Sequence, residues 1–274
     1  MNALLRIEGL DITPASAPQR KLVSNVSLAL ARGKTTCIVG ESGSGKSLTA
    51  LSVMQLLSGQ LRMQGKIFFQ GQDISQYSET AMQRLRGRQI GMIFQEPMTS
   101  LNPVLTIGFQ IGEPLQTHLG LKGSALQQKV ASLLQQVGID PDRVSSYPDE
   151  LSGGQRQRVM IAMSIACEPA LLIADEPTTA LDVTVQAQVL RLLDELKNRM
   201  QMAMLFITHD FGVVADIADE VIVMFRGNIV ESGNVSQVLQ SPQHPYTKAL
   251  LACVPDAEGK KILRPMSYDW LTTA

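Results

Sequence analysis

Residues 40–47 read Gly-Glu-Ser-Gly-Ser-Gly-Lys-Ser; they follow an apolar run at residues 35–39 and precede a helical pattern that starts at Leu48. A phosphate-binding loop requires this order of strand, glycine-rich loop and helix. Glycine lets backbone amides turn inward around a phosphate, and the start of a helix adds partial positive charge. A flexible Gly/Ser turn is the alternative, but the flanking strand and helix make it the weaker interpretation. The stretch therefore predicts a site for a nucleoside triphosphate.

All eight residues of the loop are candidates for nucleotide binding: Gly40, Glu41, Ser42, Gly43, Ser44, Gly45, Lys46 and Ser47. We expect the Lys46 ammonium to reach the β and γ phosphates and the Ser47 hydroxyl to bind Mg²⁺. Kinases, GTPases and many ATPases share such a loop, so other motifs must decide among these classes.

Two carboxylates, Asp175 and Glu176, follow a second apolar run at residues 170–174 that has the form of a buried parallel strand. At the end of such a strand Asp175 is expected to hold Mg²⁺ beside Ser47, and Glu176 to orient or deprotonate the attacking water. A surface acidic pair would be the better interpretation of the dipeptide alone. Its position after the apolar strand favours the hydrolytic role.

Two further strand ends carry polar residues. His209 follows a strand pattern at residues 203–208, and an imidazole there can hydrogen-bond the γ phosphate or the water. Gln95 follows a strand pattern at residues 90–94 and is expected to contact both Mg²⁺ and the water. Neither residue is informative alone. Gln95 also precedes a helical segment, which makes it a candidate link between nucleotide state and lobe movement.

A second glycine-rich motif, Leu-Ser-Gly-Gly-Gln at residues 151–155, precedes a helical pattern. Ser152, Gly153 and Gly154 there present a hydroxyl and free amides at a helix start, which is again an anion site. A helix-capping turn is the alternative for this pentapeptide. One nucleotide has one γ phosphate, and the two glycine-rich motifs fall on different lobes. The pair therefore predicts an assembly in which they serve different nucleotides.

Short apolar runs alternate with helical patterns, which indicates an α/β fold with a mixed sheet. Short turns join the first strands and the last pair, so we expect an antiparallel β subdomain. The β signal disappears over residues 96–150, which predicts an inserted α-helical subdomain. Prolines break up the end of the chain, which we interpret as an extension on the domain surface.

The composition excludes several classes of protein. With 274 residues, 45% of them hydrophobic, the chain is long enough for a full core, and its net charge of −1 gives no global attraction to nucleic acid. Its longest apolar runs are far below the ~18 residues of a membrane span, and no secretory signal opens it, so we expect a cytoplasmic location. Cys37, Cys167 and Cys253 are spaced unlike metal ligands and are interpreted as reduced, buried or half-buried thiols.

Together these motifs resemble the ATP-binding cassette (ABC) ATPases, in the family's order and spacing over residues 4–250: the phosphate loop, Gln95, residues 151–155, Asp175-Glu176, Ala180-Leu181-Asp182 and His209. The resemblance implies a P-loop NTPase core that binds ATP and Mg²⁺ and works as a head-to-tail dimer. ATP would lie between the phosphate loop of one subunit and Ser152, Gly153, Gly154 and Gln155 of the other, and Asp182 is a further candidate for nucleotide binding. It implies an ABC domain at residues 1–250, with a nucleotide-binding lobe at 1–95 and 168–240 and a helical signalling subdomain at 96–167, before an extension at 241–274.

Three longer stretches, at residues 95–103, 174–188 and 244–251, look like the importers of oligopeptides, dipeptides and nickel, and this chain is similar to the first of their two ATPases. That resemblance implies a second, non-identical ABC ATPase subunit, two permease subunits and an extracytoplasmic solute-binding protein. It implies a peripheral location on the cytoplasmic face of the inner membrane and no nucleic acid partner.

Two features depart from the family pattern. The family stacks adenine on an aromatic residue near the end of the first strand, but no aromatic residue precedes Phe68 here, so base selectivity remains open. Many peptide importers carry a cysteine-rich tail with an iron-sulfur cluster, whereas only Cys253 follows the His-Pro-Tyr segment. This predicts no cluster and leans towards the nickel importers.

Two other functions fit the sequence less well. ABC ATPases of DNA repair separate their half-motifs by long coiled coils, and those of translation carry two cassettes; the sequence has neither feature. A nucleotide-gated module without hydrolysis is the other, and the presence of Glu176 and His209 argues against it.

Overall fold

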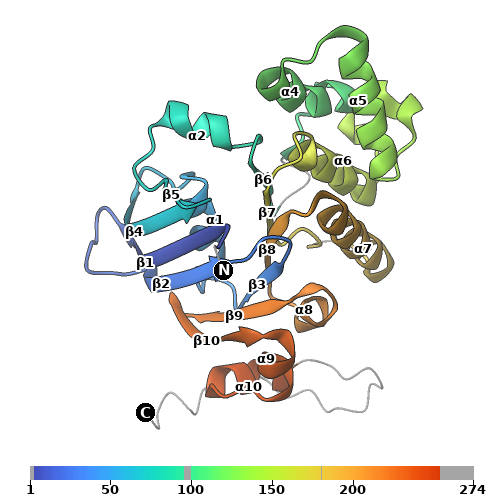
Figure 1. Ribbon diagram of the computed structural model, residues 1–274. Helices are drawn as coiled ribbons and strands as arrows, with labels where there is room; N and C mark the ends of the chain where they lie inside the picture. Colours follow the sequence, from blue (N-terminus) through green and yellow to red (C-terminus); the bar gives the residue numbers. More distant parts are fainter. Residues whose placement is uncertain (1–2, 96–99, 180, 254–274) are drawn as a thin grey trace. The chain divides into compact units, whose positions relative to one another are not determined.

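The structure is a computed structural model that describes residues 3–95, 100–179 and 181–253 (Figure 1). The chain divides into two compact units, one made from Met1–Ser75 with Leu205–Ala274 and the other from Gln76–Met204. Within the described ranges, every helix is too short or too polar to cross a membrane.

The first unit contains an antiparallel sheet in the order β2 (Val23–Leu30), β1 (Leu5–Pro14), β4 (Leu61–Phe69) and β5 (Gln72–Asp73). β1 pairs antiparallel with both β2 and β4, as the short connections predicted. Buried and exposed residues alternate along β2 because one face of the sheet packs on the core and the other does not. The last residues of β1 and the first of β4 are mostly half-buried or exposed.

The same unit holds strands in the order β10 (Asn228–Asn234), β9 (Glu220–Phe225), β3 (Thr35–Val39) and β8 (Ala203–Thr208). β3 runs parallel to β9, whereas β9 and β10 are antiparallel, so the sheet is mixed, as predicted. Arg226 and Gly227 turn the chain between β9 and β10, both with positive φ, as a tight two-residue hairpin requires.

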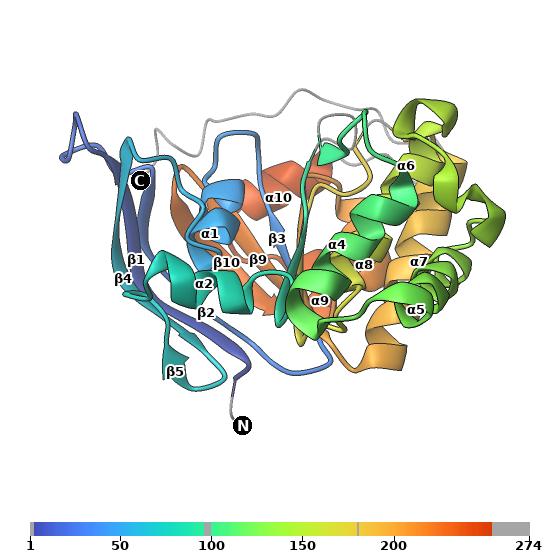
Figure 2. The ribbon, with the colours of Figure 1, turned by 90° about the horizontal axis from the view of Figure 1, so that it is seen from above.

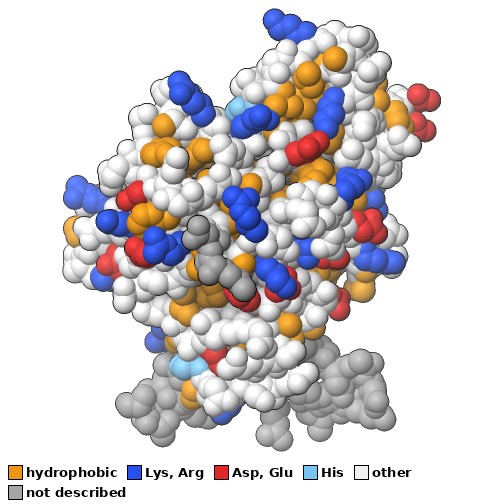
Figure 3. All heavy atoms as spheres, viewed as in Figure 1, with side chains coloured by type: hydrophobic (Ala, Val, Ile, Leu, Met, Phe, Trp, Pro, Cys, Tyr) orange, Lys and Arg blue, Asp and Glu red, His pale blue; other side chains and the backbone are white. Residues whose placement is uncertain are grey.

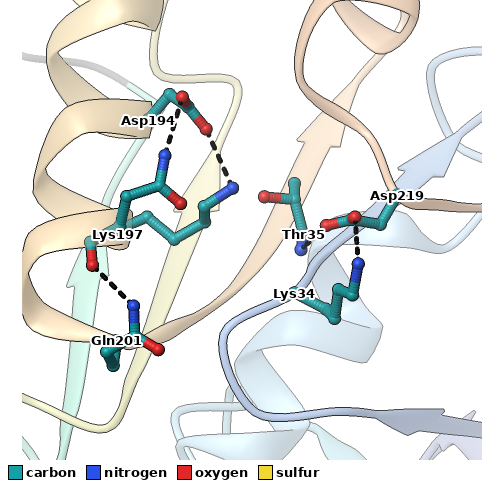
Figure 4. Close-up of polar contacts among 7 residues, drawn as sticks. Lys34, Thr35, Asp194, Lys197, Gln201 and Asp219 are labelled. Atoms are coloured by element: carbon teal, nitrogen blue, oxygen red, sulfur yellow. Dashed lines mark hydrogen bonds and ion pairs between the residues drawn. The ribbon is translucent and has the colours of Figure 1, made fainter.

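A carboxylate joins the starts of β3 and β9. The side chain of Asp219 accepts a hydrogen bond from the backbone N–H of Thr35 at 2.9 Å and from Lys34 Nζ at 2.6 Å, as Figure 4 shows. The second unit has a comparable local pair, Asp194 with the largely buried Lys197 at 2.8 Å, drawn in the same figure.

Four helices complete the first unit: α1 (Lys46–Val53), α8 (Phe211–Ile217), α9 (Val235–Gln240) and α10 (Pro245–Ala252). Figure 1 shows α9 and α10 beside β10. The sequence analysis took the prolines here as breaks, but Pro245 is the first residue of α10, where its missing N–H costs nothing. Val238, Tyr246 and Thr247 are fully buried, so this segment contributes to the core as well as to the surface.

The second unit contains the parallel pair β6 (Ile90–Ile93) and β7 (Leu171–Asp175). Its helices are α2 (Glu79–Leu85), α4 (Ile107–Leu119), α5 (Gly123–Gln136), α6 (Gly153–Ile165) and α7 (Val183–Met200), with short 3₁₀ turns η1 (Pro141–Ser145) and η2 (Pro148–Glu150). Figure 2 shows α4, α5 and α6 grouped together. Over residues 100–150 the helical interpretation is confirmed.

Candidate functional site

The phosphate loop lies between β3, which is wholly buried, and α1. Gly40, Gly43 and Gly45 have positive φ values of 152°, 78° and 102°. A Cβ on Gly40 would lie 2.1 Å from the carbonyl oxygen of Met224 on β9, so any other residue would have to displace a strand of the core. The sequence predicted that the loop needs glycines. The structure adds a reason for Gly40, because β9 leaves no room for a Cβ there.

The Lys46 side chain folds back onto its own loop. Its Nζ donates hydrogen bonds to the carbonyl oxygens of Gly40 at 2.8 Å and Glu41 at 2.9 Å, and the residue is only 5% exposed. These acceptors keep a buried ammonium satisfied. To bind a triphosphate, Lys46 has to exchange the two carbonyls for phosphate oxygens. Ser47 follows in the first turn of α1 and is half-buried.

Contacts from the end of the chain brace the loop from outside. The N–H of Gly227 donates to the carbonyl oxygen of Ser44 at 3.0 Å, and the N–H of Glu41 donates to the hydroxyl of Tyr246 at 3.0 Å. Cys37, just before the loop, is buried, and this burial raises the pKa of its thiol far above the usual range, so it stays protonated. The sequence analysis did not identify Gly227 or Tyr246, because neither belongs to a phosphate-binding motif.

His209 lies at the end of β8 and is exposed. Beside it, Asp210 caps α8 by accepting the N–H of Gly212 at 2.8 Å. The carboxylate after the histidine therefore has a local structural role, whereas the imidazole stands at the carboxyl end of a strand, where the sequence predicted it.

Glu176 in the second unit is held in place by two neighbours. Its Oε2 accepts hydrogen bonds from Thr179 Oγ1 at 2.9 Å and Gln95 Nε2 at 3.3 Å, while Asp175 before it ends β7 and is 5% exposed. Glu176 also adopts a left-handed φ of 46°, which costs a non-glycine residue about 1 kcal/mol. Backbone strain of this kind collects at functional sites. The structure thus brings Gln95 and Glu176 together and adds Thr179, which the sequence analysis missed.

Residues 152–155 form a capping box at the start of α6. Ser152 Oγ accepts the N–H of Gln155 at 3.3 Å, and Gln155 Oε1 accepts the N–H of Ser152 at 3.0 Å. Two side chains therefore satisfy each other's backbone donors. The amides of Gly153 and Gly154 belong to the first turn, where a helix offers no acceptor of its own. The capping interpretation and the anion-site interpretation are compatible, because they use different donors.

Asp182 connects this motif to α7. It caps the helix by accepting the N–H of Val185 at 2.9 Å, and a Cβ on Gly154 would lie 2.7 Å from Val185 Cγ1. Arg158 adds a hydrogen bond to Gln188 at 3.1 Å. The glycine motif and the Asp182 segment are therefore packed against each other, and Gly154 is needed for that approach.

Ser164 links the same helix to the strand that precedes Gln95. Its hydroxyl donates to the carbonyl oxygen of Met92 on β6 at 2.7 Å, and Gly91 lies so close to α6 that a Cβ would approach Ser164 O to 2.3 Å. Within this unit, α6 is thus fastened to the strands that carry Gln95 and Asp175.

The candidate residues divide between the two units. The phosphate loop and His209 belong to the first; Gln95, residues 152–155, Asp175, Glu176 and Asp182 belong to the second. Ala180 and residues 96–99 lie outside the described residues. Oxygen donors of the kind that Mg²⁺ prefers are present: the Ser47 hydroxyl, the Asp175 carboxylate and the Gln95 amide oxygen. Their roles in binding stay predictions.

Comparison with known proteins identifies the family. The family model described as ABC transporter matches residues 23–179, and the chain belongs to this family; it is an ABC ATPase cassette. A second model, described as the oligopeptide/dipeptide transporter C-terminal region, matches residues 230–268 and assigns the cassette to that group.

Curated relatives agree with this assignment. Over 262 residues the chain is 51% identical to the glutathione import ATP-binding protein GsiA of Salmonella paratyphi A, covering 92% of this chain and 42% of that protein. Over 263 residues it is 51% identical to a putative peptide import ATP-binding protein of Brucella ovis, covering 92% and 78%. The chain thus spans less than half the length of the glutathione protein.

Solved structures share the fold. CbiO1 of Clostridium perfringens, part of the CbiONQ ABC transporter complex, is 26% identical with a TM-score of 0.77, covering 88% of this chain and 92% of that one. A bacterial ABC transporter cassette, MJ0796, solved as a dimer, is 25% identical with a TM-score of 0.75, covering 84% and 98%. The predicted fold class is therefore confirmed.

The two glycines of residues 152–155 give a matched pair of variants. A Cβ on Gly153 meets nothing within 4 Å, whereas one on Gly154 meets Val185, whose branched side chain has little rotamer freedom. We expect Gly154→Ala to lower the free energy of unfolding in urea by about 1–3 kcal/mol. Gly153→Ala should leave it unchanged or raise it by up to about 1 kcal/mol.

Adding Val185→Ala to Gly154→Ala should restore most of the loss, with Val185→Ala alone as the control for the double variant. Equal destabilisation by the two glycine variants would contradict the packing role of Gly154. Because Gly153→Ala should fold normally, any loss of nucleotide hydrolysis in that variant reports on the anion site itself.

Proposed function

We propose that this cassette hydrolyses ATP to power the import of a small solute through a membrane complex. The observation that carries the proposal is the setting of Glu176. Its carboxylate accepts hydrogen bonds from Gln95 and Thr179, its backbone has a left-handed φ, and it directly follows the buried Asp175. A purely structural acidic pair has no need of a polar cluster of this kind. Membership of the ABC family and the phosphate loop support the same conclusion.

Each group has a distinct part in hydrolysis. The loop amides and Lys46 bind the β and γ phosphates, and Glu176 takes the proton of the attacking water while Gln95 orients that water. His209 donates a hydrogen bond to the γ phosphate or the water. When bound, Mg²⁺ neutralises phosphate charge; Ser47, Asp175 and Gln95 would hold it. The left-handed backbone of Glu176 fits the role of general base, because the side chain is already fixed in position before substrate binds.

The second glycine motif serves a different ATP molecule. Its first-turn amides and the hydroxyl of Ser152 would meet the triphosphate held by the loop of a second ATPase subunit, which closes a head-to-tail dimer. Asp182 and Gln155 support this surface through the α7 cap and the capping box. We infer that the partner is non-identical. The relative MJ0796, a dimer in its crystal, supports the dimeric arrangement.

Residues 96–167 form the signalling subdomain in this proposal. Large apolar side chains are exposed there, with Val104 at 75%, Phe109 at 55% and Tyr147 at 45%, and Figure 3 shows hydrophobic side chains gathered over α4 and α5. Such exposed groups are typical of a protein interface. In this proposal the exposed side chains contact a cytoplasmic helix of one of the two permease subunits. The cassette would then lie at the cytoplasmic face of the inner membrane, held there by its permeases.

Small peptides are the favoured solute. The relatives at 51% identity are described as importing glutathione and, putatively, peptides, and residues 230–268 match the oligopeptide/dipeptide group. Nickel, the other solute that the sequence resemblance left open, is the second candidate. The solute is delivered by an extracytoplasmic binding protein in this scheme.

Removal of the Glu176 carboxylate should separate ATP binding from hydrolysis. Glu176→Gln keeps the shape of the side chain and loses the general base, so we expect steady-state phosphate release to fall by about 100-fold or more while ATP affinity is retained. Glu168→Gln is the matched control, because Glu168 also has a left-handed φ, of 53°, but pairs only with Lys129 in the described contacts. Phosphate release near the wild-type rate from Glu176→Gln, assembled with its partners, would remove Glu176 from the proposed role.

A bulky residue at position 152 should block dimer closure. Ser152→Trp and Ser152→Ala both lose the helix cap, at about 1 kcal/mol, but only Trp obstructs the surface that meets ATP. In sedimentation experiments with ATP in the Glu176→Gln background, we expect the alanine variant to dimerise with the partner ATPase and the tryptophan variant to stay apart. Undiminished dimerisation of the tryptophan variant contradicts the sandwich arrangement.

Transport by the reconstituted complex tests the function and the solute together. We expect uptake of labelled dipeptide that depends on ATP and on Glu176, with little uptake of labelled nickel. The reverse selectivity would assign the cassette to a nickel importer. ATP hydrolysis without either uptake would favour the alternative of a cassette ATPase that works outside transport.

A further inference from the structure

Tyr246 is a fully buried aromatic residue on α10, outside every motif of the nucleotide site. Its ring packs on Phe225, the last residue of β9, with 4.3 Å between ring centroids. Its hydroxyl accepts the hydrogen bond from the N–H of Glu41, the second residue of the phosphate loop. A buried tyrosine normally finds one partner for its hydroxyl, and here that partner is the loop backbone.

The bonded N–H belongs to the same peptide unit as the carbonyl of Gly40. That carbonyl accepts the hydrogen bond from Lys46 Nζ at 2.8 Å. In a planar trans peptide the N–H and C=O point to opposite sides, so fixing one fixes the other. The Gly40–Glu41 peptide is therefore bonded on its outer side by the Tyr246 hydroxyl and on its inner side by the Lys46 ammonium.

The tyrosine is itself held by an anchored helix. The carboxylate of Glu231 on β10 accepts the backbone N–H groups of Gln243 at 2.7 Å and His244 at 3.0 Å, just before α10 begins. His244 Nδ1 then caps the helix by accepting the N–H of Tyr246 at 3.1 Å. A carboxylate at a helix start is also favoured by the helix dipole. The hydroxyl thus reaches the loop from a supported position.

We propose that Tyr246 is a positioning residue for the phosphate loop, and that it orients the Gly40–Glu41 peptide for nucleotide binding. The proposal rests on the proposed function, because it needs ATP at this loop. In this proposal α10, which follows β10 and α9, contributes to nucleotide affinity through Tyr246. The hydroxyl touches no substrate; it acts through the loop backbone and Lys46.

Tyr246→Phe tests the proposal because it keeps the ring and removes only the hydroxyl. We expect the dissociation constants of ATP and ADP to rise by roughly three- to tenfold, because without this hydrogen bond the free loop adopts the binding orientation of the Gly40–Glu41 peptide for a smaller fraction of the time. The turnover number should change less than KM, and the melting temperature should stay within about 3 °C of wild type. Thr36→Val is the matched control: it removes an equally buried hydroxyl from β3 of the same unit, one that makes no hydrogen bond with Glu231 or α10 in the described residues, and its nucleotide affinity should match wild type.

Unchanged nucleotide affinity in Tyr246→Phe, whatever its melting temperature, would overturn the proposal and leave the hydroxyl with a role in folding only. Hydrogen exchange on the wild-type protein gives a second test that needs no variant. Since coupling is reciprocal, ATP should slow amide exchange in α10 as well as in the loop. Protection of residues 40–47 with unchanged exchange over residues 245–252 would equally overturn it. A wild-type protein that binds no ATP would instead refute the proposed function.

Discussion

Backbone amides can hold a triphosphate only if they already point inward, and the phosphate loop depends on external contacts to meet this constraint. Gly40 lies against the Met224 carbonyl, Ser44 is bonded by Gly227, and Glu41 is bonded by Tyr246. Glycine supplies the flexibility that the loop needs, and flexibility alone would leave the amides disordered. The last strands and helix of the first unit remove that freedom.

In the second unit, backbone amides at the start of α6 are oriented by only two side chains. Ser152 and Gln155 satisfy each other's backbone donors, so the amides of Gly153 and Gly154 are available at a helix start without a cost in capping. The contact of Gly154 with Val185 and the Ser164 bond to β6 fasten this helix to its neighbours. Packed atoms therefore connect the glycine motif with α7 and with the strand before Gln95.

Strongly patterned elements were predictable from the sequence, and weakly patterned ones were not. The strands at residues 35–39 and 203–208 have the predicted bounds, because continuous apolar runs are strong signals. α2, β5 and α9 were missed because each is too short for its period to register. α10 was missed because prolines at residues 242 and 245 resembled breaks.

The candidate site could be predicted from the sequence: glycine, lysine, serine, aspartate and glutamate stand at strand ends and helix starts in the order of the ABC ATPases. Those signals are local, since a strand, a loop and a helix start occupy adjacent residues. Tertiary structure alone decided which distant groups support them. The contacts of Val185 with Gly154 and of Tyr246 with Glu41 depend on packing between segments, which no local pattern encodes.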